Sequence, residues 1–190
     1  MKGIQKAGIF FLVGVVVMLT LTTCGEVAPT EEPLSVEEHY FRQGNEFIQA
    51  GELEKAVDEY KKALEIEPEN VDALTNLGVV YYNLGRLDEA IDQYSKALAI
   101  APDDADIHSN LAAAYVQTNQ FDKALEEYQT AVTLNPDLAE AHFGLGVIYV
   151  QFDQKDKAIQ AFEKFQELDT GKDPTASSQA KQYLQQLKGP

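Results

Sequence analysis

A repeat of 34 residues constrains this chain more than any other feature. Pro68, Pro102 and Pro136 stand at that spacing, and an aliphatic residue lies two positions before each of them. Counting back from the prolines divides the chain into repeats over 37–70, 71–104 and 105–138, and a fourth follows over 139–172. Such a period is typical of one supersecondary unit that stacks on copies of itself, so the fold is expected to be a repeat array.

The same residue types recur at the same offsets within the repeats. Position 8 holds Gly44, Gly78, Ala112 and Gly146, and position 20 holds Ala56, Ala90, Ala124 and Ala158. Position 11 holds Phe47, Tyr81, Tyr115 and Tyr149, and position 24 holds Tyr60, Tyr94, Tyr128 and Phe162. Small residues let two antiparallel helices approach closely, and we expect the aromatic rings to fill the space between neighbouring hairpins. The proline ends the second helix because it cannot continue the hydrogen-bond ladder.

This pattern resembles the tetratricopeptide repeat over residues 37–172. The resemblance implies an all-α fold, a right-handed superhelical solenoid of four helix-turn-helix hairpins whose concave groove is lined mainly by the first helices. Ser35 and Glu38 predict a capping box before the first helix. Thr170 stands where repeat four should have its proline, so the second helix of that repeat is predicted to end differently.

The last residues, 173–190, predict a single amphipathic helix. Its apolar residues fall on one helical face at Ala176, Ala180, Tyr183, Leu184 and Leu187. A repeat array needs its exposed hydrophobic end covered, so we interpret this segment as a C-terminal capping helix.

The first 23 residues have the layout of a secretory signal, with Lys2 and Lys6 before an apolar run over 7–21. The sequence from Leu21 to Cys24 resembles a bacterial lipoprotein signal, although Thr23 departs from the usual Gly, Ala or Ser. That resemblance implies that Cys24 is the lipid-bearing first residue of the mature protein. An uncleaved signal anchor and ordinary cleavage are the alternatives.

Whether Cys24 is lipidated, the signal stays as an anchor or it is cleaved in the ordinary way, the repeats are expected on the extracytoplasmic side of the membrane, within the cell envelope. Residues 24–36 contain Pro29, Pro33 and several acidic residues and show no hydrophobic periodicity. This segment is predicted to be a linker that separates the repeats from the membrane.

The chain is strongly acidic, with 15 basic and 31 acidic residues and a net charge of -16. Such a field repels phosphate backbones, which argues against nucleic acid as a partner. A basic or neutral polypeptide suits it better, although solubility alone would also account for the charge.

The family resemblance also implies which residues face a partner in the groove. The predicted groove residues are Phe41, Arg42, Asn45, Asp72, Asn76, Tyr82, Asp106, Asn110 and Phe143. Their amides can pair with the backbone of an extended peptide while their aromatic rings bury its side chains. Position 2 is acidic in all four repeats, which either serves the groove or stabilises each helix start through its dipole.

Family members that bind chaperones hold a C-terminal carboxylate with Lys and Arg. In this chain Phe41, Asp106 and Asn110 stand where those basic residues are expected. The groove is therefore not expected to hold an acidic C-terminal tail.

Nothing in the residue pattern predicts catalysis, a cofactor or a metal site. His39, His108 and His142 are the only histidines, and none has zinc-ligand spacing with Cys24. The sequence predicts a non-enzymatic protein–protein interaction scaffold, tethered to the outer face of a bacterial membrane, that binds a protein or peptide. The alternative is a self-associating structural protein of the envelope, and the oligomeric state is left open.

Overall fold

A computed structural model describes residues 34–169 and 171–189 of the 190-residue chain. Within this part there are nine helices and no strands. They are α1 (Val36–Gln49), α2 (Leu53–Ile66), α3 (Val71–Asn83), α4 (Leu87–Ile100), α5 (Ala105–Gln117), α6 (Phe121–Leu134), α7 (Ala139–Gln151), α8 (Lys155–Leu168) and α9 (Pro174–Lys188). The predicted fold class is confirmed: an all-α solenoid of four hairpins followed by one more helix.

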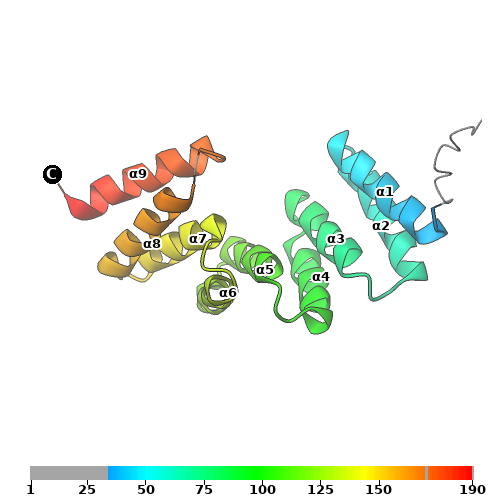
Figure 1. The fold of residues 1–190 in the computed structure, drawn as a ribbon, viewed down its shortest axis with the longest axis horizontal. Coiled ribbons are helices and arrows are strands. Elements are labelled where there is room, and N and C mark those ends of the chain that lie inside the picture. The colour runs from blue at the N-terminus through cyan, green and yellow to red at the C-terminus, as the bar shows by residue number, and fades with distance from the viewer. Residues whose placement is uncertain (1–33, 170, 190) are drawn as a thin grey trace, which may run out of the picture. The chain divides into compact units, whose positions relative to one another are not determined.

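The helices pair in chain order, as Figure 1 shows. Helices α1 and α2, α3 and α4, α5 and α6, and α7 and α8 form the hairpins, and each second helix also packs on the first helix of the next hairpin. Helix α9 packs on α8. Every contact between hairpins is therefore local in sequence, as expected for a repeat array.

Polar residues fix where the first helices begin. The Ser35 hydroxyl accepts a hydrogen bond from the Glu38 amide at 3.0 Å, and the Glu38 carboxylate accepts one from the Ser35 amide at 2.7 Å. The predicted capping box is thus confirmed. Asn70 and Asp104 cap α3 and α5 through their side chains, which satisfies amide groups that have no partner inside the helix.

Each hairpin turn places one residue in the left-handed region of backbone conformation. The φ angle is 74° at Gly51, 73° at Gly85, 58° at Asn119 and 56° at Asp153, all at repeat position 15. Asn and Asp are the non-glycine residues that tolerate this conformation best. The four turns therefore share one geometry although only two of them contain glycine.

In three hairpins a glycine of the first helix lies against an aromatic ring of the second. The pairs are Gly44 with Tyr60, Gly78 with Tyr94, and Gly146 with Phe162. A Cβ atom added to any of these glycines would stand 2.6–2.7 Å from the nearest ring atom, closer than two carbon atoms pack. Each of these rings thus lies against its own hairpin's glycine, and the rings also pack towards the next element: Tyr60 shares a buried cluster with Leu74, and Phe162 stacks on Tyr183.

Repeat three differs from the others at the glycine position. It has Ala112 in place of the glycine, and its ring, Tyr128, lies against Gly144 in α7 of the next repeat. This ring therefore packs in the gap between two hairpins. The glycine at repeat position 6, present only in repeat four, makes room for it.

The second helix of repeat four ends at Leu168, the same repeat position at which α2, α4 and α6 end. The prediction that it would end differently is therefore wrong. The Asp169 carboxylate accepts hydrogen bonds from the amides of Lys172 and Asp173 and from the Ser177 hydroxyl. These bonds stabilise the connection to α9, in a repeat that has Thr170 where the others have a proline.

Helix α9 covers the end of the array, as its apolar pattern predicted. Tyr183 stacks on Phe162 with ring centroids 4.9 Å apart and planes 5° apart, and Leu184 is buried in the same cluster. Phe165, which replaces a smaller alanine of the other repeats, is buried there as well. A single capping helix leaves room for this larger ring.

We expect Gly78→Ala to lower the free energy of unfolding by about 1–3 kcal/mol, because its Cβ atom would overlap the buried Tyr94 ring and force the helices apart. Chemical denaturation followed by circular dichroism measures the change. In a Tyr94→Leu background the same substitution should cost clearly less. An equal cost in both backgrounds would contradict the proposed overlap.

Candidate functional site

The first helices of successive repeats lie side by side along one face of the array. Helix α3 contacts α5, and α5 contacts α7. The Asn76 amide donates a hydrogen bond to the Asn45 carbonyl oxygen at 3.2 Å, and the Gln117 amide donates one to the Tyr82 hydroxyl at 3.3 Å. These bonds connect α1 with α3 and α3 with α5. Equivalent repeat positions are thereby arranged in rows.

Asn45 is held in place from two sides. Its carbonyl oxygen accepts a hydrogen bond from the Tyr60 hydroxyl at 2.7 Å as well as the one from Asn76. Burial raises the pKa of Tyr60 to about 12, although hydrogen bonding to Asn76 opposes the shift. The hydroxyl therefore keeps its proton and donates it. Asn45 thus links two repeats through its carbonyl oxygen, and its amide N–H groups can donate hydrogen bonds to a ligand.

The predicted aromatic groove residues are partly committed to packing. The half-buried ring of Phe41 lies 5.8 Å from that of Tyr60, and the half-buried ring of Phe143 lies 5.2 Å from that of Phe165. Tyr82 is also half-buried and is tied through its hydroxyl to Gln117. Each of these rings is therefore only partly available to a partner.

The acidic residues at repeat position 2 are exposed in the first turns of their helices. Asp72, Asp106 and Glu140 are the second residues of α3, α5 and α7. Partial burial raises the pKa of Asp106, and the negative charges of Asp104 and Glu140 raise it further. The carboxylates of neighbouring repeats are therefore close enough to repel one another.

The other two predicted groove residues differ in exposure. Arg42 is exposed and lies 3.8 Å from Glu46 on the same helix, a surface pair of small energetic value. Asn110 is half-buried on α5.

Sequence reasoning missed a buried carboxylate at the start of the array. The Glu37 side chain is only 5% exposed and accepts a hydrogen bond from the Asn70 amide at 2.8 Å. Burial raises its pKa, and the nearby charges of Glu67 and Glu38 raise it further. Its position next to the capping box made it look like an ordinary first-turn acid, because only the packing of α1 against the turn before α3 buries it.

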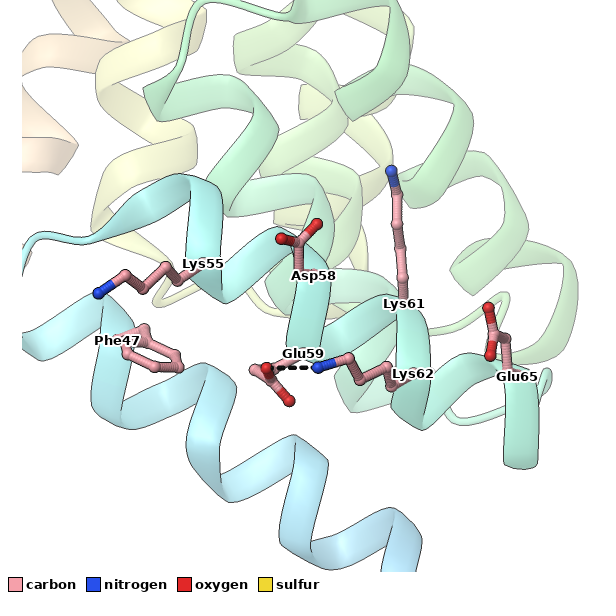
Figure 2. Close-up of a pocket in the computed structure, with 7 residues that line it drawn as sticks. All are labelled: Phe47, Lys55, Asp58, Glu59, Lys61, Lys62 and Glu65. Atoms are coloured by element: carbon pink, nitrogen blue, oxygen red, sulfur yellow. Dashed lines mark hydrogen bonds and ion pairs between the residues drawn. The ribbon is translucent and has the colours of Figure 1, made fainter.

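A shallow hollow lies on the outer side of the first hairpin, and Figure 2 shows the residues that line it. They are Phe47, Lys55, Asp58, Glu59, Lys61, Lys62 and Glu65. Glu59 pairs with Lys62 at 2.7 Å, and the Lys55 ammonium lies 5.3 Å from the centre of the Phe47 ring. Charges of both signs thus line this hollow, so it has no clear preference for a cation or an anion.

The described residues contain no group of three or more His, Cys, Asp or Glu side chains placed to hold a metal ion. No helix among them has the length and apolar character needed to cross a membrane. Cys24, the predicted lipidation site, lies outside the described residues.

Family models match most of the repeat region. A model described as TPR repeat matches residues 44–85, 80–119 and 114–151, which together span more than half of the chain, and one described as tetratricopeptide repeat matches 139–171. The chain belongs to the tetratricopeptide-repeat family. The predicted resemblance to the tetratricopeptide repeat is thereby confirmed.

Solved TPR structures resemble the whole array. A structure of the MamA protein is 28% identical and superposes with a TM-score of 0.71, covering 80% of each chain. A tetratricopeptide repeat protein from Parabacteroides merdae is 29% identical with a TM-score of 0.68, covering 80% of this chain and 60% of that one.

A curated relative matches locally. The BBSome complex member BBS4 of Bos taurus is 47% identical over 45 residues, and the match spans 24% of this chain and only 9% of that relative. The match therefore concerns individual repeat units and not the whole of that relative.

We expect Glu37→Gln to raise the unfolding temperature near neutral pH. The raised pKa of Glu37 means that its contribution to stability is complete at low pH and is lost as the pH rises through the folded-state value. Glutamine keeps an acceptor for Asn70 and carries no charge, so the gain should vanish in acid. Thermal unfolding between pH 3 and pH 8 measures this. A gain that is the same at every pH, or is matched by Glu65→Gln at an exposed site, would contradict the explanation.

Proposed function

We propose that this TPR protein is a non-enzymatic scaffold that binds a protein or peptide along the face of its first helices. The observation that carries the proposal is the arrangement of equivalent residues in rows, held by the Asn45–Asn76 and Tyr82–Gln117 hydrogen bonds. An extended chain repeats its backbone groups regularly, so rows of amides and carboxylates suit it better than they suit a small molecule. Membership of the TPR family supports protein binding in general terms.

The charge of the array favours a basic or neutral partner. Residues 34–138 contain seven basic and 21 acidic residues, which gives 7 − 21 = −14. Asp72, Asp106 and Glu140 add their carboxylates to the binding face itself. A positively charged segment would relieve the repulsion that raises the pKa of Asp106, so part of the binding energy comes from neutralising this row.

We also propose that the scaffold is tethered to the outer face of a bacterial membrane, and the sequence of the N-terminal segment supports this. Lys2 and Lys6, the apolar run over 7–21 and the lipoprotein-like sequence ending at Cys24 carry this part. The scaffold then acts in the envelope, where it holds its partner close to the membrane.

We expect Asp72→Asn combined with Asp106→Asn to weaken partner binding about 5- to 30-fold, the effect of losing one to two kcal/mol. Cross-linked affinity capture from the native membrane, quantified by mass spectrometry, identifies the proteins lost with this variant. Purified partner then gives the affinity ratio.

The matched control is Asp88→Asn combined with Asp122→Asn. These exposed residues lie in the first turns of α4 and α6, so their loss removes the same charge and the same helix-dipole contribution away from the binding face. Partners lost equally with both pairs would contradict a specific role for the first-helix face. If sedimentation shows a self-associated protein that captures nothing, the self-associating structural protein is the better interpretation.

Cys24→Ala tests the tether. For a lipoprotein we expect the variant to lose metabolic labelling by fatty acid and to accumulate as the uncleaved precursor. Fractionation and the mass of the mature protein measure both effects. A variant that is processed and located like the wild type would contradict lipidation and leave a signal anchor or ordinary cleavage.

A further inference from the structure

Repeats three and four carry the same arrangement around a histidine at repeat position 4. Nε2 of His108 lies 2.9 Å from the Pro102 carbonyl oxygen, and Nε2 of His142 lies 2.9 Å from that of Pro136. In both repeats the same ring nitrogen is thus occupied by the same backbone group. Nδ1 is the nitrogen available for another contact.

The surroundings of the two histidines also match. A lysine at position 19 lies over the tyrosine at position 11, Lys123 at 5.1 Å from the centre of Tyr115 and Lys157 at 5.3 Å from that of Tyr149. Repeat three therefore serves as an internal reference for repeat four.

Repeat three fills its site with its own carboxylate. Oε2 of Glu127 lies 2.6 Å from Nδ1 of His108, and both side chains are largely buried. Both nitrogens of this ring face oxygen atoms, a backbone carbonyl at Nε2 and a carboxylate at Nδ1. In repeat three the contact at Nδ1 is thus made by an internal carboxylate, that of Glu127.

Repeat four lacks this carboxylate. The changes from repeat three to repeat four are Glu126 to Gln160, Glu127 to Ala161 and Thr130 to Lys164, at equivalent positions. Together they remove two negative charges and add one positive charge.

The result is a hollow of about 400 Å³. We call it the repeat-four hollow, and it is lined by His142, Tyr149, Lys157, Gln160, Ala161 and Lys164. These lining residues, all of them described by the structure, include no carboxylate.

The groups that line the repeat-four hollow can donate hydrogen bonds to an anion. The Tyr149 hydroxyl accepts a bond from the Gln129 amide at 3.2 Å, which leaves its own proton to donate. The Lys164 ammonium donates a long hydrogen bond of 3.5 Å to Glu167, and both side chains are well exposed. This weak surface pair leaves the ammonium group other N–H donors for an anion. The hollow of repeat one differs, because Glu59 neutralises Lys62 there (Figure 2).

We propose that the repeat-four hollow binds the carboxylate of an Asp or Glu side chain from an acidic segment of a protein partner, at the place that the Glu127 carboxylate occupies in repeat three. This site is separate from the proposed first-helix face. The balance of charge directs an acidic segment to it: residues 139–190 contain six basic and seven acidic residues, against seven and 21 in residues 34–138. Repulsion by the first three repeats leaves the last as the place of approach.

A labelled peptide of consecutive glutamates tests the proposal, with a glutamine peptide of the same length as its reference. Fluorescence anisotropy with the full-length protein in a neutral detergent measures binding. We expect the glutamate peptide to bind and Ala161→Glu, which restores the internal carboxylate of repeat three, to weaken binding about tenfold or more. Imidazole NMR signals of His142 should shift with the peptide, while those of His108 should not.

Lys164→Gln is a second variant that leaves the buried Ala161 site intact, and it should also weaken binding. Lys155→Gln removes the same charge from an exposed position of the same helix outside the hollow, and it should weaken binding clearly less. Circular dichroism confirms that each variant is folded.

Three results would overturn the proposal. Equal binding of the glutamate and glutamine peptides would exclude carboxylate recognition. Inorganic phosphate that shifts the His142 signals, without any binding of the glutamate peptide, would indicate a site for small anions. A dimer in sedimentation that Ala161→Glu dissociates would identify a second copy of this chain as the occupant.

Discussion

The close approach of a small residue to an aromatic ring sets the geometry on which the rest of this structure depends. Gly78 has no side chain because the Tyr94 ring occupies the space where its Cβ atom would stand. This contact fixes the distance and angle between the two helices of a hairpin, and the ring is buried between them. Because the contact recurs in repeats one, two and four, these hairpins are near copies that stack in one way.

Stacked near copies turn single residues into rows, and the rows give the protein its candidate binding surfaces. Asn45 and Asn76 meet because their helices are equivalent elements of adjacent repeats. The same regularity makes departures informative. Where repeat three has Glu127 and repeat four has Ala161, the fold around the site is unchanged while its charge is reversed. Function in such an array is therefore expected where one repeat differs from its neighbours.

Much of the fold could be predicted because its signals are local. The capping box of Ser35 and the apolar face of α9 each lie within one segment, and both were confirmed. The end of α8 was predicted wrongly, because Asp169 and the three hydrogen bonds that it accepts stabilise the chain there although the proline is missing. The proposed groove residues could be placed on their helices from the repeat frame alone, but their hydrogen bonds and burial could not.

The sequence by itself determined the repeat architecture and the helical hairpin, because periodicity and turn residues act over distances of a few residues along the chain. Only the tertiary structure decided which side chains are free to meet a partner. It buried Glu37, tied Asn45 to a tyrosine and left His142 facing an open hollow. Those outcomes depend on contacts between helices, where one methyl group or one carboxylate fills a space or leaves it open.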